Sequence, residues 1–158
     1  MSDETSTATK EVDALLNRFH EAQQALMRAI AEAAPDQFER ADEEDGSVKR
    51  ILERSADEVN FYYGRLVAQA LSLPQPPGME TAVFQSLEEA RVSLQVVHRR
   101  FSNLLHDLTA EDLERKTRLE GTAEYTLRQV LETAVAHYKL RTEQLANIGE
   151  GVSNKGLR

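Results

Sequence analysis

Two residues in the last long helical segment have the types and spacing to form a site. His137 and Arg141 are four positions apart, and side chains with this spacing share one face of a helix. Arg141 also falls in line with apolar residues that should face the interior, where a charge needs a partner. One interpretation is structural: the stem of Arg141 packs inside while its guanidinium reaches the rim or a carboxylate such as Glu58.

Other polar and aromatic residues offer weaker sites. A carboxylate and an imidazole combine readily around a metal, so Glu58 and His137 could form a shifted metal site, although no spacing selects it. Tyr62, within the run Phe61 to Tyr63, could line a pocket, but aromatic residues at helical spacing more often supply core and one rim hydroxyl. We expect His20 at the boundary of an apolar helix face and His98 on a solvated edge. His106 should lie near the end of a helix.

Several classes of chemistry are excluded by what the sequence lacks. It contains no cysteine, which rules out disulfides, thiolate metal sites and a cysteine nucleophile. The chain also has no Gly-x-Ser-x-Gly elbow and no glycine-rich phosphate loop. Nucleophilic catalysis of the usual kinds therefore has no support.

Four amphipathic helices must position these residues, because apolar side chains recur three, four or seven positions apart. The first helix begins at about residue 10 and ends shortly before Pro35. The second begins at the capping residue Ser47 and ends before Pro74, the third runs from about Val83 to Leu108, and the fourth begins at Thr126. Residues 36–46 and 115–124 are predicted as loops. No segment alternates with the period of two that would indicate a strand.

The predicted bundle occupies residues 10–148, between polar tails at 1–9 and 149–158 that we expect to be flexible. Thr126 should cap its helix together with Gln129, as a capping box, and Thr109 with Asp112 should cap a short turn. Residues 47–53 and 126–132 share a local order of hydroxyl cap, apolar, basic, polar, β-branched, Leu and Glu. This echo leaves open both an internal duplication and two independently good helix starts.

Composition limits the partners. The net charge is −8, from 27 acidic and 19 basic residues, which argues against nucleic-acid binding and against an anionic membrane surface. The N-terminal residues have no hydrophobic signal region, and no apolar run approaches the roughly 20 residues that span a bilayer. We therefore expect a cytoplasmic protein.

The order of these features resembles the DinB/YfiT-like superfamily of four-helix proteins, over roughly residues 10–148. The residues that carry the resemblance are a Gly-Ser-Val start leading to Ile51-Leu52, then Ala56-Asp57-Glu58, Tyr62-Tyr63 and Gly64-Arg65-Leu66, and later Tyr125 to Leu131, His137 and Gln144-Leu145. The resemblance implies an all-α four-helix bundle with up-down-down-up topology, often paired into a homodimer. An apolar position such as Phe84 could contribute to that dimer.

The resemblance also implies a divalent metal held by three histidines, which activates a low-molecular-weight thiol in transferases and isomerases. Carried over to this sequence, the helix-two position falls at Arg54 and the two helix-four positions fall at His137 and Arg141. Guanidinium stays protonated and offers only donors, so only His137 remains as a ligand. We therefore expect no cofactor, and the usual zinc or nickel site should not form.

Three functions are compatible with these residues. The first is a non-catalytic binding or interaction protein that keeps the bundle and has lost the metal. The second is an enzyme or sensor that binds an anionic small molecule among Arg54, Glu58, Tyr62, His137 and Arg141, because forked guanidiniums suit carboxylate or phosphate. The third, a metal-dependent thiol transferase, is what the resemblance alone suggests, and the two arginines count against it.

Overall fold

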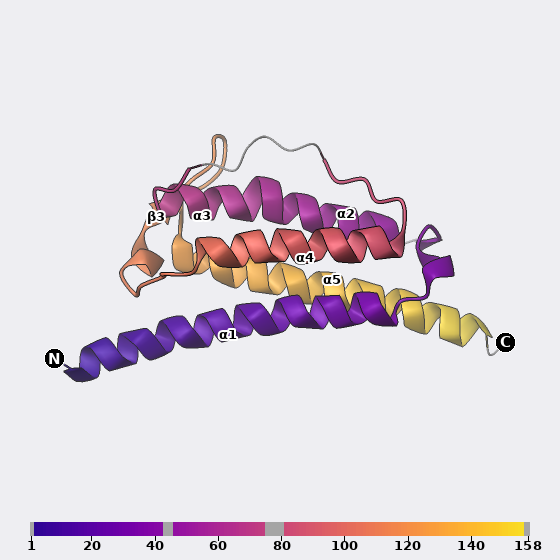
Figure 1. Cartoon of the computed structure of the whole chain (residues 1–158), viewed down its shortest axis with the longest axis horizontal. Coiled ribbons are helices and arrows are strands. Elements are labelled where there is room, and N and C mark those ends of the chain that lie inside the picture. The colour runs from indigo at the N-terminus through magenta and orange to yellow at the C-terminus, as the bar shows by residue number, and fades with distance from the viewer. Residues whose placement is uncertain (1, 43–45, 75–80, 157–158) are drawn as a thin grey trace.

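The described part of the chain forms a bundle of long helices. The computed structural model describes residues 2–42, 46–74 and 81–156. The α1 and α5 helices run in one direction, whereas α2, α3 and α4 run in the other, as Figure 1 shows. This is the up-down-down-up order that the resemblance implied, and it confirms the predicted all-α bundle.

The first and last helices are longer than predicted. Helix α1 (Ser2–Glu32) begins inside the segment expected as a tail, and α5 (Leu127–Gly156) continues through most of the other one. Ser2 to Thr9 contain no proline or glycine, so nothing in the backbone prevents the helix from extending outward. The apolar stripe of α1 is buried as expected, and its members are Val12, Leu15, Phe19, Leu26 and Ile30.

The second predicted helix consists of three joined pieces. Helix α2 (Val48–Glu58) begins where the Ser47 hydroxyl accepts the Arg50 N–H at 3.1 Å, which confirms the predicted cap. A π-helical turn, η2 (Val59–Tyr63), follows, and α3 (Gly64–Ala70) completes the helical segment. The π turn was not predicted, and it contains one more residue than an α-helical turn.

Helix α4 (Leu87–Leu104) is shorter than the predicted segment at both ends. Ser86 caps it by accepting the Glu89 N–H at 3.1 Å, and the Glu89 carboxylate in return accepts the Gln85 N–H. The Ser86 hydroxyl thus caps the start of the helix, and Glu89 binds the residue before the N-cap. The preceding residues are extended, and they hold Val83 exposed and Phe84 buried. The prediction that Phe84 is an exposed contributor to a dimer is therefore wrong.

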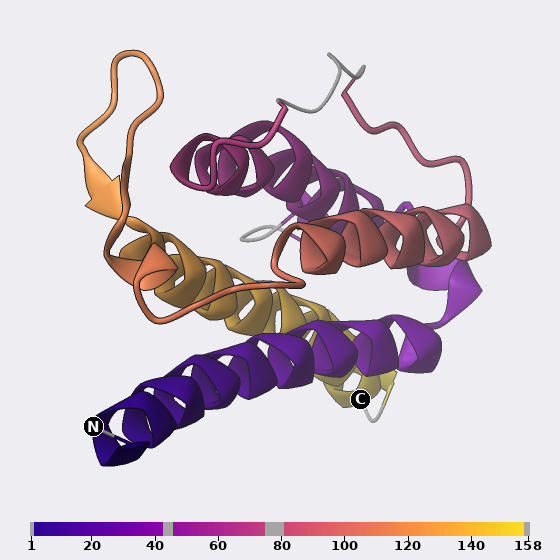
Figure 2. The ribbon, with the colours of Figure 1, turned by 60° about the vertical axis from the view of Figure 1, so that its left-hand side comes forward.

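Short antiparallel ladders join the helices within each half of the chain. The 3₁₀ helix η1 (Pro35–Gln37) leads to β1 (Ala41–Asp42), which pairs with β2 (Gly46–Ser47). The 3₁₀ helix η3 (Asp112–Glu114) leads to β3 (Lys116–Thr117), which pairs with β4 (Tyr125–Thr126). The second hairpin stands out from the bundle in Figure 2. Two-residue strands are too short to alternate detectably, so the sequence predicted only loops there.

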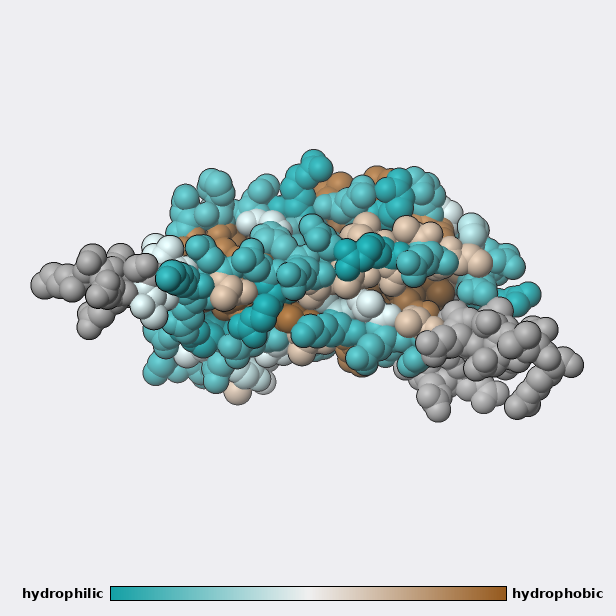
Figure 3. Space-filling model, turned by 90° about the horizontal axis from the view of Figure 1, so that it is seen from below, coloured by the Kyte–Doolittle hydropathy of each residue, from teal (hydrophilic) through white to brown (hydrophobic). Residues whose placement is uncertain are grey.

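One hydrophobic core fills the space between the helices and includes the aromatic contacts of Phe19 with Phe101 and with Tyr138. The face seen in Figure 3 is largely hydrophilic and carries only small apolar patches. No described helix combines the length and the apolarity that crossing a bilayer requires. The core thus supplies a rigid frame for the few polar groups that lie inside it.

Candidate functional site

Helices α2 and α5 bring three of the predicted site residues together. The Glu58 carboxylate lies 3.0 Å from Nδ1 of His137 through Oε2, and its Oε1 accepts Nη2 of Arg141. Arg141 also donates from Nη1 to the Gln144 side chain at 2.9 Å. One carboxylate therefore binds both polar residues of the opposite helix, and the prediction that Arg141 reaches Glu58 is confirmed.

Burial differs among the three side chains and decides what each can do. Arg141 retains 9% of its side-chain surface, Glu58 26% and His137 38%. A carboxylate oxygen can only accept, so the contact places a proton on Nδ1 of His137. In neutral His137 the lone pair then lies on Nε2. The site thus consists of an internal ion pair with a partly exposed imidazole beside it.

Arg54 does not join this group. Its side chain is exposed, and no ion pair connects it to another described residue. Arg54 and Glu58 are one helical turn apart, and in the structure it is Glu58 that faces His137 and Arg141. The convergence of Arg54, His137 and Arg141 that an anion pocket would require is therefore not formed.

The tyrosine whose ring contacts His137 is Tyr63 and not the predicted Tyr62. Tyr62 is half-buried, and its pKa is raised by burial and by the neighbouring Tyr125 hydroxyl. Tyr63 is 2% exposed, and its ring meets the His137 ring edge-on at 5.2 Å between centroids. Burial, followed by the charge of Glu58, raises the pKa of Tyr63 far above its ordinary value. Tyr63 is thus the aromatic residue of the site, and helical spacing could not single it out because the π turn is not visible in the sequence.

Two buried donors near the ion pair have no hydrogen-bond partner among the described residues. They are the Tyr63 hydroxyl and Nε of Arg141. The other unpartnered buried atom is Nε2 of His98, on α4, whose ring packs edge-on against Tyr138 at 5.1 Å. His98 is 6% exposed, and burial lowers its pKa to about 4. The prediction that His98 lies on a solvated edge is therefore wrong.

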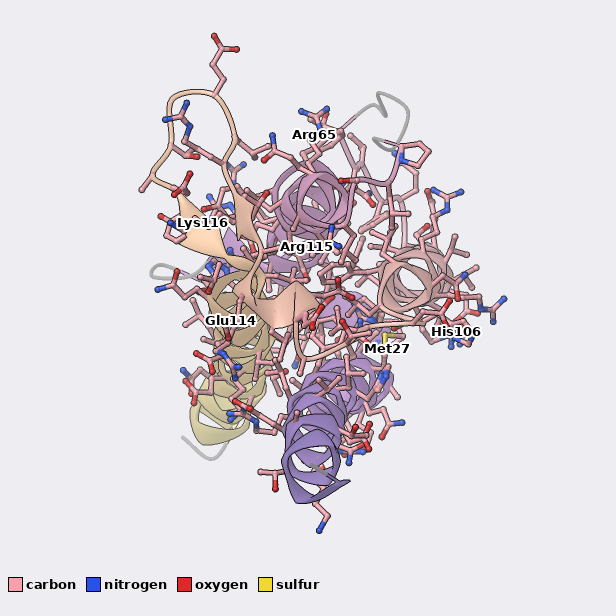
Figure 4. All side chains as sticks on the ribbon, turned by 90° about the vertical axis from the view of Figure 1, so that its left-hand side faces the viewer. Met27, Arg65, His106, Glu114, Arg115 and Lys116 are labelled. Carbon is pink, nitrogen blue, oxygen red and sulfur yellow. The ribbon has the colours of Figure 1, made fainter. Side chains whose placement is uncertain are left out.

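The remaining histidines lie on the surface. His20 is exposed beside Phe19, as its boundary position predicted. His106 projects from the outer edge of the bundle in Figure 4, close to the end of α4. A cavity of about 760 Å³ also lies apart from the site, between the end of α1, η1 and the start of α4, and is lined in part by Ile30, Phe38 and Leu87. None of the predicted site residues lines this cavity.

The side chains at this site do not form a metal-binding set. Among the described residues, no three imidazole, carboxylate or thiol side chains gather closely enough to hold a metal ion. Glu58 and His137 supply two candidate ligands, but Arg141 places a permanent cation on the same carboxylate. The residues present therefore do not fit the three-histidine metal site.

Comparison with known proteins connects the chain to a family. The model of the DinB superfamily matches residues 44–145, which include α2, α4 and most of α5. The chain belongs to the DinB superfamily. The crystal structure of a DinB-like protein, YjoA from Bacillus subtilis, superposes with a TM-score of 0.68 over 89% of this chain and 92% of that one, at 15% identity. That likeness shows the DinB fold alone, and no curated protein matches this sequence.

Proposed function

We propose that this DinB-superfamily protein is a non-catalytic binding protein in which an internal ion pair replaces the metal centre implied by the family resemblance. The observation that supports the proposal is the double contact of Glu58, which binds Arg141 with one oxygen and His137 with the other. Both oxygens of the carboxylate are thus engaged by the protein itself. The polar cluster joins two helices, which is a structural role.

Electrostatics disfavour a divalent ion at this position. Two unit charges 4 Å apart interact by about 4 kcal/mol at an effective dielectric of 20, and a divalent ion doubles the repulsion. Arg141 cannot relieve this repulsion by losing its proton. Thiol transfer that depends on such a metal is therefore disfavoured.

The anionic-ligand alternative is weakened by the same contacts. Arg54 is exposed and lies outside the group, and the two Nη atoms of Arg141 already donate to Glu58 and Gln144. An incoming carboxylate or phosphate would have to displace Glu58 while facing its charge. Binding through an outer surface, including pairing with a second copy of the chain, requires no such exchange.

Metal analysis of full-length variants tests the proposal. Arg141→His removes the cation and adds a third donor beside Glu58 and His137, whereas Arg54→His adds an imidazole at an exposed position on α2. After the proteins are loaded with zinc and dialysed into zinc-free buffer, we expect less than about 0.1 equivalent of zinc per chain in the parent protein and in Arg54→His. Arg141→His should retain a larger amount, because three donors with an open position match a zinc site.

A parent protein that keeps one equivalent of zinc or nickel through dialysis, and loses it in His137→Ala, would overturn the proposal. Pairing is tested separately by light scattering at micromolar concentration. We expect twice the mass of the chain, and a monomeric mass would contradict the homodimer.

A further inference from the structure

The two halves of the chain repeat the same order of elements. In each half a long helix leads to a 3₁₀ helix, a two-stranded ladder and a second helix. Each second helix begins with a hydroxyl cap: Ser47 accepts the Arg50 N–H at 3.1 Å, and Thr126 accepts the Gln129 N–H at 3.2 Å. Figure 1 shows that the second pair runs opposite to the first, as a two-fold axis perpendicular to the helices requires.

A constant offset relates the two halves. Ser47 and Thr126 are 79 residues apart, because 126 − 47 = 79. The polar contacts Glu58–His137 and Ser102–Gln23 both join residues separated by 79. A two-fold axis superposes each residue of one copy on the equivalent residue of the other copy. Two equivalent residues can therefore contact each other only close to the axis. Both contacts therefore indicate where such an axis passes.

Burial follows the same offset along α2 and α5. From Val48 to Val59, each of the six buried residues has a buried counterpart 79 residues later on α5. The pairs are Val48 with Leu127, Ile51 with Val130, Leu52 with Leu131, Ser55 with Ala134, Ala56 with Val135 and Val59 with Tyr138. On α1 and α4 the pairs include Leu15 with Leu94, Phe19 with His98, Ala22 with Phe101 and Leu26 with Leu105. These matches extend well beyond the helix caps.

The π turn changes the offset by one. After Tyr138, each buried residue of α5 has a buried counterpart 78 residues earlier: Arg141 with Tyr63, Leu145 with Val67 and Ile148 with Ala70. At 79 only Leu145 has one, which is Leu66. A π turn is an α-helix with one residue inserted, so a step of one at η2 is the change that an insertion there produces. The α5 helix has no such turn at the equivalent place.

We infer that the bundle consists of two copies of one helix pair and that Tyr63 is the counterpart of Arg141, a fourth residue of the site that positions His137. Arg141 on α5 contacts Glu58 across the axis, and Tyr63 on the α2 side contacts His137 in return. Tyr62, four residues after Glu58, would occupy this place in an unbroken α-helix. Because the π turn contains one extra residue, Tyr63 occupies this place instead.

Deleting one residue from the π turn tests the register directly. Removal of Asn60 should convert η2 into an ordinary α-helical turn and leave Tyr63, Val67 and Ala70 facing the core. We expect a cooperative transition with a melting temperature within about 5 °C of the parent. Deletion of exposed Thr133 from regular α5 is the matched control. It should rotate the rest of that helix by about 100° and abolish cooperative unfolding.

The role of Tyr63 is tested by the NMR signals of the His137 imidazole in full-length variants. Tyr63→Leu should shift these signals, because the ring that meets the imidazole edge-on is lost, whereas Tyr63→Phe should retain them because the ring remains. Tyr62→Leu is the matched control and should leave them nearly unchanged.

Either of two results would overturn the inference. One is loss of cooperative unfolding on deletion of Asn60 as complete as on deletion of Thr133. The other is a larger shift of the His137 signals in Tyr62→Leu than in Tyr63→Leu. Neither readout depends on metal content, so this inference and the proposed function can fail separately.

Discussion

The Glu58 carboxylate and the His137 imidazole face each other across α2 and α5, with 3.0 Å between Oε2 and Nδ1. The same carboxylate binds Arg141, one turn further along α5. Arg141 is 8% exposed, so its charge depends on Glu58 for compensation inside the protein. Glu58 is consequently the residue whose loss should affect the cluster most.

Glu58→Gln should lower the free energy of unfolding by roughly 2–3 kcal/mol. Removing one partner of a buried pair leaves an uncompensated charge, which typically costs 3–5 kcal/mol, and the partial exposure of Glu58 reduces this figure. Urea unfolding followed by circular dichroism measures the change.

The double variant Glu58→Gln with Arg141→Met is the control. It removes both charges and should recover most of the loss, because apolar replacement of a whole buried pair is often neutral. An unchanged stability in Glu58→Gln alone would show that the ion pair does not stabilise the fold.

The pairing of Arg141 with Glu58 could be predicted from the sequence because helical spacing placed Arg141 on the inner stripe, where a cation needs a carboxylate. The failures have equally specific causes. The family pattern predicts Arg54 at the site, yet in the structure Arg54 is exposed and Glu58 contacts His137 and Arg141. Tyr63 could not be separated from Tyr62, because spacing arguments assume 3.6 residues per turn and the π turn breaks that period.

The histidines show the limit of one-dimensional patterns on helix α4. His98 follows apolar Val97 and precedes two arginines, and this pattern predicts a solvated edge. In the structure it is buried against Tyr138. Two adjacent positions can both be buried where a helix packs against neighbours on two sides, and the sequence does not say which edge is covered.

Buried His98 should make stability depend on pH. Its pKa is lowered by burial from 6.5 to about 4, so between these values the unfolded chain binds a proton that the folded chain excludes. Stability contributed by this residue is therefore complete above pH 6.5 and is lost as the pH falls toward 4. The loss should reach about 3 kcal/mol, since each pKa unit corresponds to about 1.4 kcal/mol.

His98→Leu removes the titrating imidazole and should flatten the pH dependence of the free energy of unfolding between pH 6.5 and 4. Because Nε2 has no described hydrogen-bond partner, the replacement should cost little at pH 7. Urea unfolding at several pH values, with the parent protein in parallel, measures the difference. Parallel profiles for the two proteins would contradict the prediction.

Glu53 holds the segment before α4 against α2. Its Oε2 accepts the Phe84 N–H at 2.8 Å and Lys49 Nζ at 2.6 Å, and Lys49 also donates to the Phe84 carbonyl. Glu53→Ala should leave the Phe84 N–H without its acceptor and cost roughly 1–2 kcal/mol. Hydrogen exchange at the Phe84 amide should accelerate, and Glu53→Gln, which keeps an acceptor oxygen, should show a smaller effect. Equal exchange rates in Glu53→Ala and the parent would rule out this anchoring role.

The caps Ser47 and Thr126 should contribute similarly to the free energy of unfolding. Only at Thr126 does the residue three positions later return a hydrogen bond. Ser47→Ala and Thr126→Ala should each cost about 1 kcal/mol, because each leaves a helix N–H without its acceptor. Gln129 also returns a bond, since its Oε1 accepts the Thr126 N–H at 2.9 Å. The corresponding residue after Ser47 is Arg50, which has no acceptor to offer.

Gln129→Ala should therefore destabilise the protein by about 0.5 kcal/mol, and Arg50→Ala should change stability by less, because only Gln129 completes a capping box. Urea unfolding of the four single variants gives the comparison. A larger loss for Arg50→Ala than for Gln129→Ala would mean that the caps differ in some way other than the reciprocal bond.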